Sequence, residues 1–346
     1  MEEGPRGIEV EAVSAWLTDH VEGASPPYGF ELIAAGGSNL TFEVTDDAGG
    51  RWALRRPPVG KTLPTAHDMA REWRIIDALA PSRFGVPVPA AIAACDDDGV
   101  TGAPFYVMGF VDGLILRDEA AAAGLTADEC RTATESLVDV QVAFHTVDVD
   151  AVGLGDLGRR DGYVERQLAR WLRQYERGGT RELPLLVELH DRLAAKVPTA
   201  QGVGLAHGDY RFDNTVLGGD RTVAAVLDWE LCTLGDPVAD FCWSLGYWAD
   251  PGDDAAFLAS SPTLHQAFPR RAEVADLYAR RSGFDLGDLD YFVAFSWWKM
   301  ACIVEGVYAR RLAGATGGRA SGDAEAIGKR TEALLEHANA AARGVR

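Results

Sequence analysis

The sequence predicts a two-lobed α+β fold, with a small antiparallel-sheet N-terminal lobe in residues 1–110 and a larger, mainly helical C-terminal lobe in residues 111–346. Short runs with alternating apolar residues fill much of the first lobe, and helical spacing of apolar residues dominates the second. The 346 residues are enough for two lobes, and the hydrophobic content of 47% is that of a folded protein.

The first two strands are expected to form a hairpin around a glycine-containing turn. Residues 30–44 read FELIAAGGSNLTFEV, an apolar run followed by a turn and then by alternating apolar residues. Such a turn can lie over phosphate groups and offer backbone N–H donors to them. The turn consists of Gly36, Gly37, Ser38 and Asn39.

Three more strands and a helix complete the predicted N-terminal lobe. In the third strand, residues 51–56 (RWALRR), the alternation of side chains places Arg55 and Arg56 on opposite faces, with Arg56 expected in solvent. A helix is expected from Thr65 to Ala80, because apolar residues recur there at helical spacing. The other two strands are expected in residues 87–94 and 104–108, around a turn at residues 96–99.

Helical patterns predict most of the C-terminal lobe. Residues Thr126 to Glu129 match a capping box, which opens a helix expected to continue to Ala143. Short strands are expected at Leu205 and in residues 223–227. The other helices are expected in residues 163–176, 185–195 and 289–312 and in a terminal segment ending near residue 343.

The segment from Leu205 to Leu245 carries the functional pattern. Asp209 is followed five residues later by Asn214, and Asp228 comes after a short apolar run. Mg²⁺ prefers oxygen ligands, which Asp228 and Asn214 can supply. Asp209 can accept a hydrogen bond from a hydroxyl group and orient that group for attack. Arg211 can place a fixed positive charge beside a phosphoryl group.

Two stretches of this segment are HGDYRFDN (residues 207–214, the catalytic loop) and VLDWELCTLGDPVADF (residues 226–241). Both resemble the aminoglycoside phosphotransferase and choline kinase superfamily, which shares the protein-kinase-like fold. The resemblance implies transfer of the γ-phosphoryl group of ATP to a hydroxyl group of a small molecule, with Mg²⁺ as the second cofactor. The LDWELxTLGDP form most resembles the kinase domains fused to acyl-CoA dehydrogenases. The matching catalytic and metal-binding positions are His207, Asp209, Asn214 and Asp228.

The same resemblance assigns an ATP site to the N-terminal lobe, built from the glycine turn and three further positions. Arg55 lies where kinases place the phosphate-binding Lys of the third strand, and Arg can also pair with phosphates. Glu72 matches the helix Glu that pairs with this cation. The residues expected to contact adenine are Met108, Phe110 and Val111.

Neighbouring polar residues receive supporting roles in this interpretation. His207 is expected to hold the catalytic loop through its ring nitrogens rather than to act as an acid or base. Asp236 and Asp240, in the GDPxxD stretch, are expected to brace the same loop. Glu230 is either a second metal contact or a solvated carboxylate, and Asp213 is expected to be a solvated loop charge.

Two other classes of function compete with this interpretation. Because Arg replaces Lys at position 55, the chain could be a non-catalytic ATP-binding module. A metal-dependent hydrolase could use His207, Asp209, Asp213 and Asp228, but it would leave the glycine turn without a role.

The acceptor molecule is also open within the phosphotransferase interpretation. A cationic antibiotic calls for an acidic pocket, for which Glu305 is a candidate. A hydroxyacyl thioester calls for basic and apolar groups instead. The pattern does not choose between ATP and GTP.

Composition excludes some partners. With 33 basic and 52 acidic residues the net charge is −19, which disfavours binding to a phosphate backbone, so no nucleic-acid partner is expected. No apolar run is long enough to span a bilayer and no signal peptide is evident, so a cytoplasmic protein without membrane association is expected. Five scattered cysteines without CxxC spacing favour free thiols over a disulfide scaffold or a zinc site. The sequence carries no pattern that indicates an oligomeric state.

Overall fold

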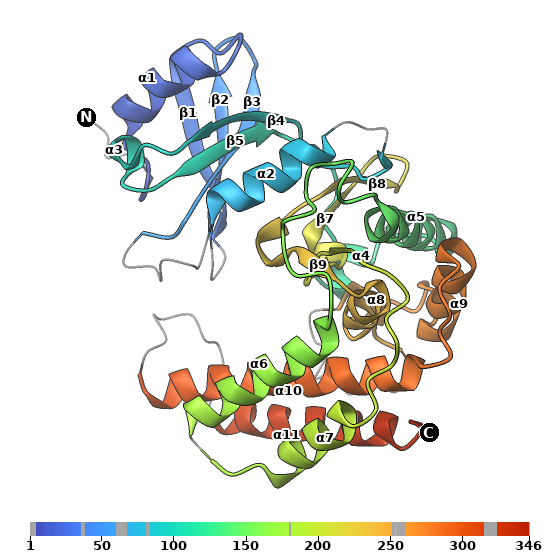
Figure 1. Ribbon diagram of the computed structural model, residues 1–346. Coiled ribbons are helices and arrows are strands. Elements are labelled where there is room, and N and C mark those ends of the chain that lie inside the picture. The colour runs from blue at the N-terminus through green and yellow to red at the C-terminus, as the bar shows by residue number, and fades with distance from the viewer. Residues whose placement is uncertain are drawn as a thin grey trace. The chain divides into compact units, whose positions relative to one another are not determined.

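The computed structural model describes residues 5–35, 39–59, 68–80, 84–179, 181–250, 253, 261–314 and 324–345. The chain divides into two compact units. The first unit contains Met1–Leu114, Thr215–Gly219 and Val223–Leu231, and the second contains Ile115–Asn214, Asp220–Thr222 and Cys232–Arg346. A five-stranded antiparallel sheet in the first unit and a mainly helical second unit confirm the predicted α+β class (Figure 1).

The first unit is built on the five-stranded sheet, whose strands follow the order β1-β2-β3-β5-β4. Every neighbouring pair is antiparallel. The predicted hairpin and third strand are both present, and Arg55 pairs in register with Thr41. The strands span Tyr28–Ala35 (β1), Leu40–Asp46 (β2), Arg51–Arg56 (β3), Ala91–Cys95 (β4) and Phe105–Gly109 (β5).

Helices cover both faces of this sheet. Helix α1 (Val10–His20) packs Leu17 into a core that includes apolar residues of β2, β3 and β5. Helix α2 (Met69–Leu79) contacts β4 and β5 (Figure 1). The Trp73 ring of α2 lies 5.9 Å from the Tyr106 ring of β5, between centroids. Strand alternation therefore directs one set of side chains toward α1 and the other toward α2.

Arg56 lies on the α1 side of the sheet, and the prediction that it is solvated is wrong. Its side chain is buried and donates hydrogen bonds to the carbonyl oxygens of Gly7, Thr101 (2.9 Å) and Pro57 (3.1 Å). A buried guanidinium is tolerated when its donors are satisfied in this way. The alternation was correct, but the face assumed to be solvated is covered by other segments of the unit.

Two local elements differ from the sequence prediction. The expected turn between β4 and β5 contains a one-turn helix, α3 (Asp98–Thr101). Asp97 caps this helix by accepting a hydrogen bond from the backbone N–H of Gly99 (2.8 Å), a common N-cap interaction for Asp. Helix α2 starts at Met69, and the predicted start at Thr65 lies outside the described residues.

A hairpin from later in the chain completes the first unit. Strands β7 (Thr215–Leu217) and β8 (Val223–Val226) pair antiparallel. The backbone of Leu217 exchanges two hydrogen bonds with Leu114, of 2.8 and 2.9 Å, and the N–H of Val226 donates to the Pro87 carbonyl (2.9 Å). These bonds place the residues that follow β8 in the same unit as the sheet.

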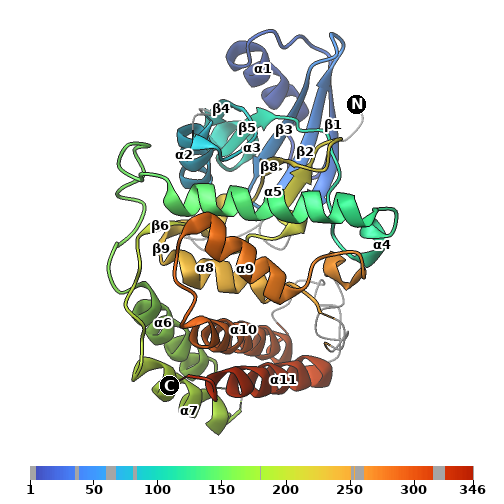
Figure 2. The same cartoon turned by 90° about the vertical axis from the view of Figure 1, so that its right-hand side faces the viewer.

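The second unit combines helices with one short strand pair. Strands β6 (Gly204–Ala206) and β9 (Thr233–Gly235) pair antiparallel. Helix α10 (Leu289–Leu312) lies beside α11 in both views and also contacts α6, α7 and α8, which explains why most of its sides are apolar (Figures 1 and 2). The other helices are Glu119–Ala122 (α4), Ala127–Thr146 (α5), Tyr163–Gly178 (α6), Pro184–Ala194 (α7), Pro237–Leu245 (α8), Arg271–Ser282 (α9) and Ala324–Ala342 (α11). Among the described residues, no helix is long and apolar enough to cross a membrane.

The predicted capping box at the start of α5 is confirmed and gives a direct test of helix stability. The Thr126 hydroxyl accepts the N–H of Glu129 (3.2 Å), and the Glu129 carboxylate accepts the N–H of Thr126 (2.9 Å). Thr126→Ala is expected to lower the free energy of unfolding by about 1 kcal/mol, because a helix N–H loses its acceptor. Chemical denaturation measures this change, with Asp128→Ala on the exposed side of the same turn as the control. An equal loss in both variants would contradict the capping argument.

Candidate active site

The catalytic loop begins at the end of β6 and is held by Asp240 of helix α8. The backbone N–H groups of His207 and Gly208 donate to the Asp240 carboxylate, at 3.1 and 2.9 Å. Gly208 has a φ of +83°, a left-handed conformation that favours glycine. The chain therefore turns sharply just before Asp209.

Asp240 is itself buried and paired. His145 of α5 lies 3.1 Å from the Asp240 carboxylate through Nε2, and its Nδ1 lies 2.7 Å from the Tyr278 hydroxyl. Burial alone would raise the pKa of Asp240, but the bonds from His145 and the loop outweigh burial and lower it. Asp236 caps α8 by accepting the N–H groups of two residues in its first turn, at 2.9 and 3.0 Å. Asp240 therefore holds the catalytic loop, whereas the bonds of Asp236 stay within its own helix.

His207 is buried beneath the loop. Its Nδ1 accepts the backbone N–H of Asp209 at 3.3 Å. A ring in this position stabilises the loop backbone, as expected for a structural rather than an acid–base residue.

Asp209 and Asn214 lie together within the second unit. The Asn214 amide nitrogen donates to the Asp209 backbone carbonyl (2.7 Å) and to its carboxylate (2.9 Å). This arrangement fixes the carboxylate and leaves the Asn214 Oδ1 atom without a partner among the described residues. Asn214 therefore retains an oxygen that a metal ion could use.

Arg211 joins the two aspartates of the loop. Its guanidinium lies 3.3 Å from the Asp209 carboxylate and 2.9 Å from that of Asp213, and it covers the Tyr247 ring at 4.7 Å. Burial raises the pKa of Asp213, while Arg211 acts in the opposite direction. Asp213 is therefore a half-buried ion-pair partner of Arg211 rather than a freely solvated loop charge.

In the first unit, Arg55 connects helix α2 with the segment that follows β8. Its Nε donates to the Glu72 carboxylate (3.0 Å), and its Nη2 pairs with Asp228. Glu72 also accepts the backbone N–H of Trp229 at 3.2 Å. Burial raises the pKa of Glu72 to about 7, although the adjacent Arg55 lowers it. Three residues that are far apart in sequence thus form one charged cluster.

The backbone at Asp228 has an uncommon conformation. Its φ is +64°, in the left-handed region that non-glycine residues seldom occupy. Such conformations persist where surrounding bonds hold them and are concentrated at functional sites. Here the Arg55 ion pair and the Trp229–Glu72 hydrogen bond supply that support.

The glycine turn meets the same cluster through its last residue. Gly36, Gly37 and Ser38 lie outside the described residues. Asn39 is buried, and its Nδ2 donates to the Glu230 carboxylate at 2.9 Å. Its Oδ1 atom is buried without a partner among the described residues. Glu230 is therefore a hydrogen-bonded neighbour of Asp228 rather than a freely solvated carboxylate.

The predicted adenine-binding residues lie at the end of β5. Met108 is buried and pairs in register with Ala53, while Phe110 and Val111 are half-buried. The Arg51 guanidinium covers the Phe110 ring at 4.1 Å. Their role toward adenine remains a prediction.

Each of the two units offers an oxygen donor of the type that Mg²⁺ prefers. Asp228 offers a carboxylate whose Oδ2 atom has no partner among the described residues, and Asn214 offers its amide oxygen. Mg²⁺ is commonly held by one or two such ligands, with substrate phosphates supplying the others. The described residues contain no group of three or more His, Cys, Asp or Glu side chains suited to a metal.

Glu305 is not an acceptor-facing acid. It is buried in α10 and bonded to the Arg181 guanidinium at 2.8, 3.0 and 3.2 Å, and Arg181 also donates to Glu332 (2.8 Å) and to the Gly328 carbonyl (2.9 Å). A salt bridge of this kind connects α10 with α11. No sequence pattern indicates this partner, because Arg181 is far from both helices along the chain.

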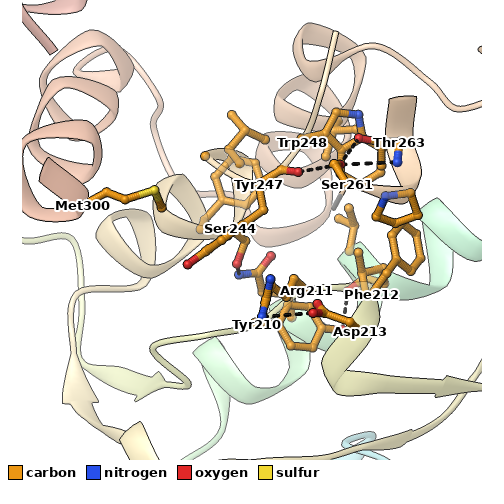
Figure 3. Close-up of a pocket in the computed structure, with 18 of the residues that line it drawn as sticks. Tyr210, Arg211, Phe212, Asp213, Ser244, Tyr247, Trp248, Ser261, Thr263 and Met300 are labelled. Carbon is orange, nitrogen blue, oxygen red and sulfur yellow. Dashed lines mark hydrogen bonds and ion pairs between the residues drawn. The ribbon is translucent and has the colours of Figure 1, made fainter. Parts of the chain in front are cut away.

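A pocket of the second unit adjoins the catalytic loop. Arg211 and Asp213 of the loop face this pocket, whose other lining residues include Tyr247, Trp248 and Met300 (Figure 3). Its remaining wall is mostly apolar and includes residues of α5, α8 and α9. Arg330 of α11 adds a second cation to the lining.

Fold and motif together define a kinase-type phosphotransferase class, and the family comparison agrees. The model of the phosphotransferase enzyme family matches residues 29–284, so the chain belongs to this family. Acyl-CoA dehydrogenase family member 10 of Mus musculus is 34% identical over 87% of the chain, and family member 11 of Gallus gallus is 35% identical over 81%. The chain spans only 28% and 36% of the lengths of these two relatives.

Solved structures show the same fold. A protein from Ralstonia eutropha classed as an aminoglycoside phosphotransferase has 34% identity and a TM-score of 0.79, covering 97% of this chain and 98% of its own. Spectinomycin phosphotransferase, in complex with ADP and spectinomycin, has 13% identity and a TM-score of 0.62, covering 97% of this chain and 99% of its own. The similarity to the second protein concerns the fold alone.

Proposed function

We propose that this protein transfers the γ-phosphoryl group of ATP to a hydroxyl group of a small molecule in a Mg²⁺-dependent reaction. The observation that carries the proposal is the position of Arg55 between Glu72 and Asp228. This cluster combines a phosphate-binding cation, its helix partner and a metal-binding carboxylate. A decayed site would be expected to have lost one of the three, so the cluster favours catalysis over a non-catalytic module.

Each polar residue has a role in this reaction. Asp209 orients the acceptor hydroxyl and accepts its hydrogen bond, while the Asn214 amide fixes the carboxylate. Asp228 and Asn214 are the residues that would hold Mg²⁺, which would neutralise charge on the phosphates. Arg211 supplies positive charge beside the transferred group. Nucleotide use is also supported by family-fold neighbours whose structures contain ADP or AMP-PNP.

A metabolic acceptor is favoured over a cationic antibiotic. An aminoglycoside would need free carboxylates, but Glu305 is neutralised by Arg181. The pocket beside the catalytic loop carries Arg211, its partner Asp213 and Arg330 within a mostly apolar wall. The curated relatives named as acyl-CoA dehydrogenase family members point the same way, toward acceptors of the hydroxyacyl type. The antibiotic acceptor is retained as the competing hypothesis.

Arg55 provides a test of the nucleotide site. Arg55→Met is expected to weaken Mg-ATP binding at least about 10-fold, because a buried cation that pairs with phosphate is lost. Titration calorimetry with Mg-AMP-PNP measures this change. Arg160→Met is the control, since Arg160 also pairs with a carboxylate but lies at an exposed position of the second unit. Unchanged affinity in Arg55→Met would place the nucleotide elsewhere.

The function itself is tested by a phosphate-transfer assay with Mg-ATP and a mixed acceptor panel. The panel contains aminoglycosides, a macrolide, choline, simple sugars and hydroxyacyl-CoA esters. Transfer to one class that depends on Asp209 supports the proposal and identifies the acceptor. If Mg-ATP neither binds nor turns over, the phosphotransferase proposal fails and the non-catalytic alternative replaces it.

A further inference from the structure

A buried lysine of the second unit has no anionic partner among the residues that the structure describes. Lys299 of α10 is only 7% exposed, and its Nζ lies 4.0 Å from the centroid of the Trp243 ring of α8. Among the described residues, it forms neither an ion pair nor a hydrogen bond. Lysines are seldom buried unless they are paired, because removing an ammonium group from water is costly.

Two neighbouring polar groups are also unsatisfied. The Nε1–H group of Trp243 is buried without an acceptor among the described residues. Ser296 lies one turn before Lys299 on the same face of α10, and its buried hydroxyl also has no partner among those residues. Lys299 and Trp243 can only donate hydrogen bonds, and the serine hydroxyl can donate as well. A group of donors without acceptors is suited to an anion.

A continuous series of contacts connects Lys299 with the catalytic loop. Asp209 pairs with Arg211 (3.3 Å), which covers the Tyr247 ring (4.7 Å). The Tyr247 and Trp243 rings meet edge to face at 5.9 Å, and Lys299 lies on Trp243. Lys299 is also close enough to Asp209 for the carboxylate to act on its charge. The donor group is therefore connected, through Tyr247 and Arg211, with the residue assigned to orient the acceptor hydroxyl.

The lysine remains charged under ordinary conditions. Burial lowers the pKa of Lys299 to about 8, with Arg170 acting in the same direction and with Asp240 and Asp209 opposing. At pH 7 most molecules therefore carry the ammonium ion. A cation–π contact alone compensates little of the cost of burying that charge. A purely structural role thus leaves the position unexplained.

We propose that Lys299 and the Trp243 indole N–H bind an anionic group of the phosphoryl acceptor, so that the acceptor is a hydroxylated organic anion with a carboxylate or phosphate close to its reacting hydroxyl. This assignment rests on the proposed function, because Asp209 defines which hydroxyl reacts. The aromatic pair of Trp243 and Tyr247 would contact the apolar part of the same molecule. A polycationic antibiotic is disfavoured at this position by the charge of Lys299.

The test compares charged and uncharged probes in pairs, by equilibrium titration calorimetry with Mg-AMP-PNP present. The carboxylate pair is 3-hydroxybutyrate and 3-hydroxybutyramide, and the phosphate pair is glycerol 3-phosphate and glycerol. We expect the native protein to prefer the anion in one pair by about 10- to 100-fold, the range for a hydrogen bond to a charged group. The pair that shows the preference distinguishes a carboxylate from a phosphate.

Three variants test whether Lys299 and Trp243 cause the preference for the anion. Lys299→Met is expected to abolish it, Lys299→Arg to retain much of it, and Trp243→Phe to reduce it by losing the indole donor. Lys329→Met, at an exposed lysine of α11, is the control and should leave it unchanged. Thermal unfolding verifies that each variant is folded. No preference in the native protein, or an undiminished preference in folded Lys299→Met, overturns the proposal.

Failure of the proposed function is distinguishable in the same samples. Slow Mg-ATP hydrolysis is measured for the native protein and for Asp209→Asn. A Lys299-dependent anion preference without Asp209-dependent turnover would support the anion site and reject phosphoryl transfer. Asp209-dependent turnover without any anion preference would reject the anion site and leave the proposed function intact.

Discussion

Asp209→Asn is expected to lower the rate of phosphoryl transfer at least about 100-fold, while leaving Mg-nucleotide binding nearly unchanged. Asn has the same shape as Asp but cannot accept a proton from the acceptor hydroxyl at neutral pH. In the loop, it would also lose the charge that pairs with Arg211 at 3.3 Å. Because the effect concerns the chemical step, it should appear in kcat rather than in the KM for ATP.

Asp213→Asn is the matched control for this experiment. Asp213 lies on the same loop and pairs with the same guanidinium at 2.9 Å, so it tests whether loss of any carboxylate beside Arg211 is enough. We expect a reduction of less than about 10-fold, because Asp213 is assigned no role toward the hydroxyl. Equal losses in both variants would show that the carboxylates act by positioning Arg211. Full activity of Asp209→Asn would remove Asp209 as the orienting residue.

The sequence predicted best those parts of the site whose residues lie close together along the chain or on one strand. The motif assigned Asp209 and Asn214 to one short loop, and the structure shows two hydrogen bonds from the Asn214 amide to Asp209. Strand alternation separated Arg55 from Arg56, and the family resemblance supplied Glu72 as the partner of Arg55, which the structure shows at 3.0 Å. A short motif, or a strand whose two faces are known from alternation, is enough to predict such contacts.

Contacts made across long stretches of sequence were not predictable in the same way. Asp228 belongs to the first unit because β7 and β8 bond to Leu114 and Pro87, and no local pattern encodes those bonds. The support of Asp240 by His145 is of the same kind, since 95 residues separate them. Arg56 was assigned to solvent because alternation defines a face but not what covers it.

Lys299 illustrates a signal that was present in the sequence but needed the structure for its interpretation. It is the lone charged residue in the run FSWWKMACIV of residues 295–304, so an unusual environment could have been suspected. The sequence cannot show whether such a lysine reaches solvent along its aliphatic chain. The contact with Trp243 and the low exposure resolve that question.

Lys299→Met is expected to increase the free energy of unfolding at pH 7 by about 1 to 3 kcal/mol, the opposite sign to most buried substitutions. The folded-state pKa of about 8 lies below the ordinary value of 10.5, so the unfolded chain binds this proton more tightly than the folded one. The difference corresponds to about 3 kcal/mol of stability lost below pH 8. Methionine removes the charge, although the loss of the contact with Trp243 offsets part of the gain.

The pH dependence separates this explanation from improved packing. The advantage of Lys299→Met over the native protein should be complete below pH 8 and should disappear as pH rises from 8 to 10.5, where the native lysine becomes neutral in both states. Denaturation midpoints of both proteins across this range measure the difference, and groups common to both cancel. Lys329→Met, at an exposed lysine, should differ from the native protein by less than about 0.5 kcal/mol throughout.

A stability gain of Lys299→Met that does not depend on pH would indicate improved packing. A destabilised Lys299→Met would show that the ammonium group is already satisfied in the native protein. A gain that disappears as pH rises would mean that Lys299 lowers the stability of the ligand-free protein, as is expected of a residue that binds a ligand. Its anionic partner is supplied by the ligand rather than by the folded chain.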